Sequence, residues 1–218
     1  MKSILSIALL LLSQFAVAET APPRYADAVA AIKRYDRMYQ TPPHPIVFVG
    51  SSSIRKWETL QVAFGSYNVI NRGIGGSTIE DIAVHLDDLV VSYQPRQVVL
   101  YVGDNNIPDE KESATSVAGK TVDLVRAIRA RLPGVPLLYI SMKPSPSRDK
   151  YRDKYVEANR LIADALAKEP QASFVDVFAP MLDNGKARRE LFVDDMLHLN
   201  RDGYRLWEEQ VGPHLLKN

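Results

Sequence analysis

Short apolar segments alternate with longer segments of helical periodicity along most of the chain. The apolar segments are rich in Val and Ile and are apolar at successive positions. Strands of this kind are typical of a parallel sheet that is covered on both faces. We predict five strands, at residues 46–49, 67–71, 97–102, 136–142 and 173–177.

Apolar residues spaced three or four positions apart fill the intervals between these strands. They predict helices over residues 25–40, 79–89, 117–132, 151–165 and 204–215. The alternation of strand and helix predicts an α/β fold, a three-layer α/β/α sandwich with a five-stranded parallel sheet. Ligands bind such sheets at the carboxyl ends of the strands, so reactive groups are expected just after a strand.

The first 18 residues have the features of a signal peptide. Lys2 supplies a positive start, residues 4–12 are almost wholly apolar, and residues 16–18 read Ala-Val-Ala, a cleavable sequence. The apolar run is shorter than the roughly 20 residues that a membrane-spanning helix needs. We therefore expect export to the periplasm or the extracellular space, with cleavage after Ala18 and no stable membrane anchor.

Composition narrows the function classes of the remaining chain. The protein has 218 residues, 46% of them hydrophobic and 24% charged, which is the balance of a soluble globular domain. We expect residues 19–45 to form an N-terminal helix and lead-in to one domain over residues 46–218. Without Lys2 the basic residues equal the 26 acidic ones, so nucleic acid is not an expected partner. The absence of cysteine excludes disulfides and a thiol nucleophile. The oligomeric state stays open.

A serine-rich turn follows the first predicted strand directly. Residues 50–53 read Gly-Ser-Ser-Ser and stand where the crevice of the sheet is expected to hold reactive groups. Such a turn is also typical of a helix N-cap, because serine accepts hydrogen bonds from the free amides of a first helical turn. A serine hydroxyl is a poor nucleophile without a neighbouring base, so a hydrolytic role requires a histidine.

The four histidines of the chain differ in their settings. His44 precedes the first strand, at the opposite end of the sheet, and His85 lies inside a predicted helix. His214 lies near the end of the last helix, where an imidazolium favours the helix dipole. His198 lies in the last loop, three residues after Asp195. A carboxylate at that spacing can accept the Nδ1 proton and leave Nε2 free to receive a serine proton, although the same pair also fits a capped turn.

Two further polar turns follow the second and third predicted strands. Residues 75–78 read Gly-Gly-Ser-Thr, and residues 103–106 read Gly-Asp-Asn-Asn. The first turn fits a tight turn followed by a capping box between Ser77 and Glu80. Asn105 also fits a residue that hydrogen-bonds its own loop. Both turns lie at the edge of the sheet where reactive groups are expected.

Taken in order, four blocks resemble those of the SGNH, or GDSL-like, hydrolases over residues 46–205. They are Gly50-Ser51-Ser52, Gly75-Gly76, Gly103-x-Asn105 and Asp195-x-x-His198. The resemblance implies a flavodoxin-like SGNH hydrolase fold, with Ser52 as nucleophile, His198 as base and Asp195 as its orienting acid. It also implies oxyanion donors from the Ser52 and Gly76 amides and the Asn105 side chain. Ser51 and Asn106 stand where the family usually has acids that brace these loops.

The expected activity is hydrolysis of carboxylic esters through an acyl-enzyme. No long apolar insertion is present to shelter a fatty chain, so short acyl groups are expected, first of all acetyl esters of carbohydrate. Trp57 and the loop 143–148 are candidate rim contacts, although Trp57 also fits a core residue. Asp104 has no accompanying His or carboxylate cluster, so no metal is assigned, and the reaction needs no cofactor.

Two alternative functions remain open at this point. One is a lipid-directed acylhydrolase, which the resembled family also contains. The other is a non-catalytic ligand-binding module that keeps the fold with a degenerate site, as Ser51 and Asn106 suggest. A flavodoxin-like cofactor binder fits the architecture but leaves the Asp195-x-x-His198 block unexplained.

Overall fold

A single five-stranded sheet forms the centre of the molecule. The structure, a computed structural model, describes residues 21–217, so the predicted signal peptide lies outside the described residues. All pairings in the sheet are parallel, and the strand order is β2-β1-β3-β4-β5. The strands are β1 Ile46–Gly50, β2 Val69–Gly73, β3 Gln97–Tyr101, β4 Leu137–Ile140 and β5 Ala172–Val175, and a small hairpin of β6 Leu182–Asp183 and β7 Lys186–Ala187 lies apart from them.

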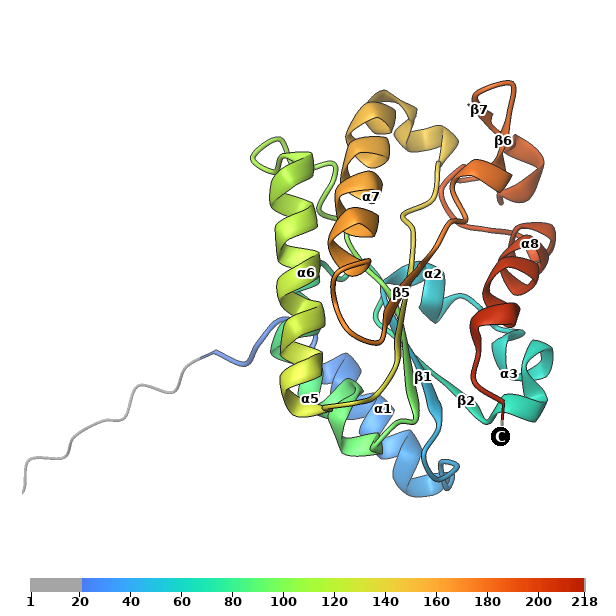
Figure 1. The fold of residues 1–218 in the computed structure, drawn as a ribbon. Helices are drawn as coiled ribbons and strands as arrows, with labels where there is room; N and C mark the ends of the chain where they lie inside the picture. Colours follow the sequence, from blue (N-terminus) through green and yellow to red (C-terminus); the bar gives the residue numbers. More distant parts are fainter. Residues whose placement is uncertain (1–20, 218) are drawn as a thin grey trace, which may run out of the picture.

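Helices cover both faces of this sheet, as Figure 1 shows. One group packs on one face and comprises α1 Ala26–Met38, α4 Ile79–Val84, α5 Leu86–Leu89, α6 Ala114–Arg131 and α7 Arg152–Leu166. The other group comprises α2 Ser52–Arg55, α3 Leu60–Ala63 and α8 Arg201–Val211. The three layers confirm the predicted α/β/α fold class.

The two faces of β1 show why the predicted strands are apolar throughout. Val47 and Val49 belong to the core beneath α1 and α4–α7, whereas Ile46 and Phe48 belong to the core beneath α2, α3 and α8. Successive side chains of a strand point to opposite faces, and here both faces are buried. A strand in the central layer therefore has no polar face, and this explains why successive residues of the predicted strands are apolar.

The strand order places a crevice at the carboxyl end of β1. The chain passes from β1 to β2 on one side of β1 and then crosses back to β3 on its other side. The order in which strands are added to the sheet therefore reverses direction at β1. Ligands of open α/β sheets bind at such switch points. The turns after β1, β2 and β3 meet there, and they are the turns that the sequence analysis singled out.

Three local predictions differ from the structure. The helix predicted over residues 79–89 is two helices, α4 and α5, which break at His85 (φ −101°, ψ 17°). The break leaves no mark in the sequence, because Ile82, Leu86 and Leu89 keep the same apolar spacing across it. The second strand begins at Val69 and not at 67, because a 3-10 turn over Gly65–Tyr67 precedes it. His214 lies in a separate 3-10 turn, Gly212–His214, after α8.

The capping box at α4 lies one residue later than predicted. Thr78, not Ser77, is the N-cap, and its partner is Asp81, not Glu80. The Ser77 hydroxyl is fully buried and donates to the carbonyl of Ile74, so it is not available to the helix. The shift frees Glu80 for a different contact, described below.

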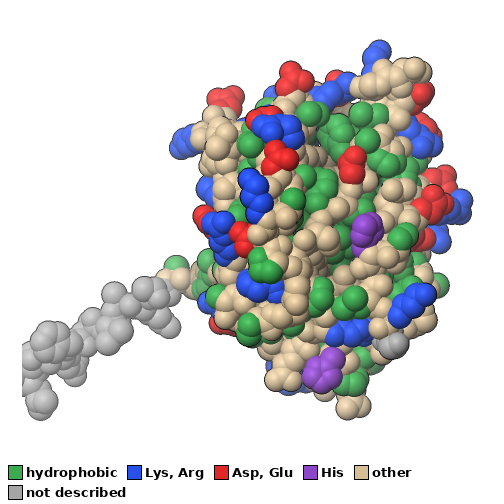
Figure 2. Space-filling view, in the orientation of Figure 1, with side chains coloured by type: hydrophobic (Ala, Val, Ile, Leu, Met, Phe, Trp, Pro, Cys, Tyr) green, Lys and Arg blue, Asp and Glu red, His purple; other side chains and the backbone are tan. Residues whose placement is uncertain are grey.

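The surface carries charges of both signs. Lys and Arg side chains are interspersed with Asp and Glu on the face drawn in Figure 2. Within residues 21–217, no helix combines the length and the apolar character that crossing a bilayer requires.

Candidate active site

The turn after β1 exposes only one of its three serines. Ser51 and Ser53 are each 1% exposed, whereas Ser52 is half-buried and reaches the surface. Ser52 is the first residue of the short helix α2, directly after the carboxyl end of β1. Of the three adjacent serines, the one that reaches the surface is therefore the serine of the Gly-x-Ser pattern.

The His198 ring lies against this serine. Its Nε2 atom is 2.9 Å from Ser52 Oγ, across 146 residues of sequence. Its Nδ1 atom is 2.5 Å from Oδ2 of Asp195. Nδ1 therefore carries the proton that Asp195 accepts, and Nε2 is left to accept from the serine hydroxyl. The three side chains thus form one continuous hydrogen-bonded series, from Ser52 through His198 to Asp195.

The same Asp195 carboxylate also fixes the loop that carries the ring. Its Oδ1 atom accepts from the amides of Leu197 (2.9 Å) and His198 (2.8 Å). Met196, between Asp195 and Leu197, adopts a left-handed conformation, and its carbonyl accepts from the amide and the hydroxyl of Ser147. The capped-turn interpretation of Asp195 and its orienting interpretation therefore hold together, because each uses a different oxygen.

Hydrogen bonds hold Asp195 in its ionised form. Its partial burial alone would raise the pKa of the carboxyl, but the His198 ring and the amides of His198 and Leu197 donate to it and lower that pKa well below its usual value. A carboxylate that stays ionised keeps the imidazole in one tautomer and stabilises the imidazolium when it forms.

Three hydrogen-bond donors border the same space. Among residues 21–217, no hydrogen bond is formed by the backbone amide of Ser52 or of Gly76. Gly76 has φ +77°, a left-handed conformation that favours glycine. Asn105 Nδ2 donates to the carbonyl of Ser77 at 2.9 Å, which uses one of its two N–H groups and leaves the other.

Arg148 fixes the orientation of the Asn105 amide. Its guanidinium donates to Asn105 Oδ1 at 3.0 Å, so the amide oxygen is held as the acceptor and the nitrogen must point away from it. The same guanidinium donates to Oδ1 of Asp104 at 2.9 Å and also to the Asp104 carbonyl. Arg148 lies in the loop that the sequence suggested as a rim, but nothing in the sequence pairs it with Asn105.

Asp104 is the centre of a buried polar cluster beneath these donors. Lys143 Nζ lies 3.0 Å from its Oδ2, and the side chains of Lys143 and Asp104 are 0% and 5% exposed. The hydroxyls of Tyr101 and Tyr155 also donate to its carboxylate, at 3.0 and 2.6 Å. Burial alone would raise the pKa of Asp104, but Lys143 and Arg148 lower it well below its usual value. Asp104 is thus a structural anion, and Lys143 is not a rim contact.

The two departures from the family pattern have different consequences. Asn106 Oδ1 accepts from the amide of Ile79 at 3.1 Å, and its Nδ2 donates to Glu80 at 2.9 Å. It therefore braces the start of α4, in place of an acid. The buried Ser51 hydroxyl has no hydrogen-bond partner among the described residues, so it braces nothing.

An open pocket of about 530 Å³ lies over the serine and the histidine. Its lining includes Ser52, Gly76, Asn105, His198 and Arg148 together with Tyr25, Arg55 and Leu197. Trp57 is 1% exposed and packs edge-on against Phe48 and Trp207, so it is a core residue and not a contact at the rim of the pocket. No three His, Asp or Glu side chains of residues 21–217 are grouped to hold a metal ion.

Solved structures share this fold. A GDSL-like lipase from Bacteroides thetaiotaomicron is 20% identical with a TM-score of 0.70, and the match covers 86% of this chain and 96% of that one. Axe2, an acetyl xylan esterase from Geobacillus stearothermophilus, is 16% identical with a TM-score of 0.62, over 79% of this chain and 94% of that one. At these identities the likeness shows the fold alone.

Sequence comparison gives the family. A family model described as the GDSL-like lipase/acylhydrolase family matches residues 48–206. The human platelet-activating factor acetylhydrolase IB subunit alpha1 is 30% identical over 165 residues, which are 73% of this chain and 70% of that protein. The chain belongs to the GDSL-like lipase/acylhydrolase family and is an ester hydrolase. The predicted membership is confirmed, while the role of each site residue stays a prediction.

Replacing Asp104 by Asn tests whether the buried cluster supports the site. The change leaves Lys143 buried without its carboxylate, and we expect the free energy of unfolding to fall by about 3–5 kcal/mol. Chemical denaturation at pH 7 measures this loss, with Asp123→Asn on the exposed side of α6 as control, since the Asp123 side chain is 78% exposed.

The difference in unfolding free energy between the wild-type protein and Asp104→Asn should also depend on pH. Asp104 has a lowered pKa in the folded protein, so it stabilises the fold above its unfolded pKa. The difference between the wild-type protein and Asp104→Asn should shrink as the pH falls below about 4, because only the wild-type protein has this contribution to lose. A difference that stays constant into acid would contradict the role of Asp104 as a paired anion.

Proposed function

We propose that the protein is a serine esterase in which Ser52 is the nucleophile, His198 the general base and Asp195 the orienting acid. The observation that carries the proposal is the 2.9 Å contact between Ser52 Oγ and His198 Nε2, with the other ring nitrogen on Asp195. A serine hydroxyl needs such a neighbour to lose its proton during attack.

The reaction proceeds in two halves. Ser52 Oγ attacks the ester carbonyl carbon while His198 Nε2 takes the hydroxyl proton, and His198 then gives that proton to the departing alcohol. Water attacks the resulting acyl-enzyme, His198 takes a proton from it, and the acid leaves as the proton returns to Ser52. His198 is the only group that moves a proton in either half.

The negative charge that develops on the carbonyl oxygen needs fixed donors. The free amides of Ser52 and Gly76 and the second N–H of Asn105 border the pocket that Ser52 and His198 line. One such donor contributes about 3–4 kcal/mol to transition-state stabilisation. These donors argue against a non-catalytic module, since a degenerate site has no need of a triad and an oxyanion hole in one pocket.

For the substrate we propose a short acyl group, acetyl first. The pocket over Ser52 is open, and arginine, histidine and asparagine line it beside the apolar Ile74 and Leu197, so it holds a small polar ester without enclosing a long fatty chain. Two of the similar proteins are named for acetyl esters, one of platelet-activating factor and one of xylan. Acetylated carbohydrate is the proposed substrate, and a lipid ester is the second candidate because the family is that of the GDSL-like lipases.

Single replacements of the three serines test the nucleophile. Ser52→Ala should lower kcat for 4-nitrophenyl acetate by about 10⁴-fold or more, because only this hydroxyl contacts His198. Ser51→Ala and Ser53→Ala are matched controls in the same turn, since both hydroxyls are buried and lack hydrogen-bond partners. Retained turnover in Ser52→Ala, or a comparable loss in either control, would sink the assignment.

A double-mutant cycle tests the pair formed by Asn105 and Arg148. Asn105→Ala should lower kcat by about 10²- to 10³-fold if its amide is an oxyanion donor. Arg148→Lys keeps a cation beside Asp104 but loses the fork that holds the Asn105 oxygen, so it should also lower kcat. In the Asn105→Ala background, Arg148→Lys should cost no further kcat. Fully additive losses would mean that Arg148 does not act through Asn105.

We also propose that the protein is exported and cleaved after Ala18, which rests on the sequence of residues 1–18 alone. The intact mass of the protein recovered from periplasm or culture medium measures this directly. The mature chain should begin at Glu19. A full-length mass in the soluble fraction would contradict export with cleavage.

A further inference from the structure

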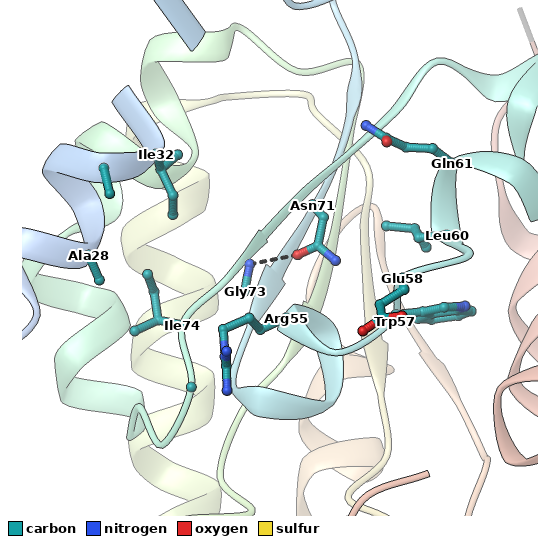
Figure 3. A pocket seen from close by; sticks show the side chains of 12 residues that line it. Ala28, Ile32, Arg55, Trp57, Glu58, Leu60, Gln61, Asn71, Gly73 and Ile74 are labelled. Carbon is teal, nitrogen blue, oxygen red and sulfur yellow. Dashed lines mark hydrogen bonds between the residues drawn. The ribbon is translucent and has the colours of Figure 1, made fainter. Parts of the chain in front are cut away.

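A second pocket adjoins the one over Ser52. It has a volume of about 450 Å³ and is drawn in Figure 3. Four residues line both pockets: Ala28, Arg55, Ile74 and Gly75. The two are therefore neighbouring parts of one cleft, and a substrate that reaches Ser52 can extend past these four residues. Of the four, Arg55 is the only one with a charged side chain.

Arg55 lies on the same short helix as the proposed nucleophile, Ser52. Ser52 and Arg55 are the first and last residues of α2, three positions apart. Side chains at that spacing share one helix face, with about 5–6 Å between their Cβ atoms. Figure 3 shows Arg55 projecting from α2 between Ile74 on one side and Trp57 and Glu58 on the other. Ser52 and Arg55 also line the same pocket, so a group bound by the guanidinium lies in the pocket that holds the reacting serine.

The Arg55 side chain is exposed, and its guanidinium is unpaired within the described part of the chain. Among residues 21–217, its side chain forms no hydrogen bond and no ion pair. The other arginine in the lining of the two pockets, Arg148, is engaged with Asp104 and Asn105. Glu58 lines the second pocket, but it lies outside ion-pair distance of Arg55. The pocket over Ser52 has no Asp or Glu in its lining.

The backbone next to Arg55 makes room for its head group. A Cβ atom on Gly75 would lie 2.6 Å from Arg55 Nε and 2.9 Å from one terminal nitrogen. The guanidinium thus rests directly on the Gly75 backbone, one residue before the amide of Gly76 that borders the oxyanion position. Arg55 is exposed and lines both pockets, so its head group is open to the cleft at the junction of the two.

We propose that Arg55 forms a subsite for an anionic group on the alcohol part of the ester, a carboxylate such as that of a uronate. A planar guanidinium with free N–H groups matches a carboxylate in a two-point contact. The proposal rests on the proposed function: the acetyl group carries no charge, so a charged group of the substrate must belong to the alcohol. The substrate class becomes acetylated acidic carbohydrate rather than neutral carbohydrate.

Three matched esters test the subsite. The probes are an O-acetylated methyl uronoside, its neutral methyl ester, and the sugar 6-phosphate acetylated at the same hydroxyl. The wild-type enzyme should prefer an anionic ester over the neutral one by about 10-fold in kcat/KM, as one charge-assisted contact provides. Preference for the phosphate over the carboxylate would assign the same site to a phosphorylated sugar. The preference should fall with added salt.

Variants on the two sides of the cleft should move this preference in opposite directions. Arg55→Gln should bring the ratio of anionic to neutral kcat/KM close to one, and Arg55→Lys should retain part of it. Glu58→Gln removes the nearest competing carboxylate of the second pocket and should raise the ratio. Arg189→Gln is the matched control: Arg189 is exposed, forms no side-chain hydrogen bond or ion pair among residues 21–217 and lines neither pocket, so its loss should leave the ratio unchanged.

Equal rates on anionic and neutral esters in the wild-type enzyme, or an unaltered ratio in Arg55→Gln, would overturn the subsite while leaving the esterase intact. Calorimetry with the non-acetylated uronoside and its methyl ester asks the same question without turnover. If no ester is hydrolysed but the uronoside still binds through Arg55, the proposed function fails and the subsite stands. If the two sugars bind alike, the subsite fails.

Discussion

The meeting of two loops at one edge of the sheet is the constraint on which the site depends. Ser52 follows β1 and His198 precedes α8, and their side chains touch although 146 residues separate them. The strand order makes this possible, because it leaves the carboxyl end of β1 in a crevice between β2 and β3. The oxyanion candidates follow β2 and β3 and reach the same crevice for the same reason.

A second layer of interactions holds these loops in register. The buried Asp104 carboxylate binds Lys143, Arg148 and two tyrosines, which come from four different segments. Arg148 also donates to Asn105 and so links the side chain of Asn105 to this cluster. Asp195 does the same on the other side with its two oxygens, one for the ring and one for the loop. Donors that are already held in position need little reorganisation when charge develops in the transition state, and this lowers the activation barrier.

Most of the fold could be predicted from periodicity, because central strands buried on both faces leave an apolar signature. Sequence order and the family blocks also predicted which serine and histidine would meet. The missed features depend on tertiary contacts. The break at His85 and the shift of the capping box to Thr78 keep the same residue types at nearly the same spacing. The Arg148–Asn105 contact and the free Arg55 guanidinium follow from loop packing, which no spacing in the sequence encodes.

The central claim is that Ser52 is the one activated serine of the turn. Treatment with a fluorophosphonate, followed by peptide mapping by mass spectrometry, tests it most directly. The account predicts one adduct per chain, located on Ser52 and lost when His198 is replaced by Ala. An adduct on Ser51 or Ser53, or a folded protein with no adduct at all, would contradict it.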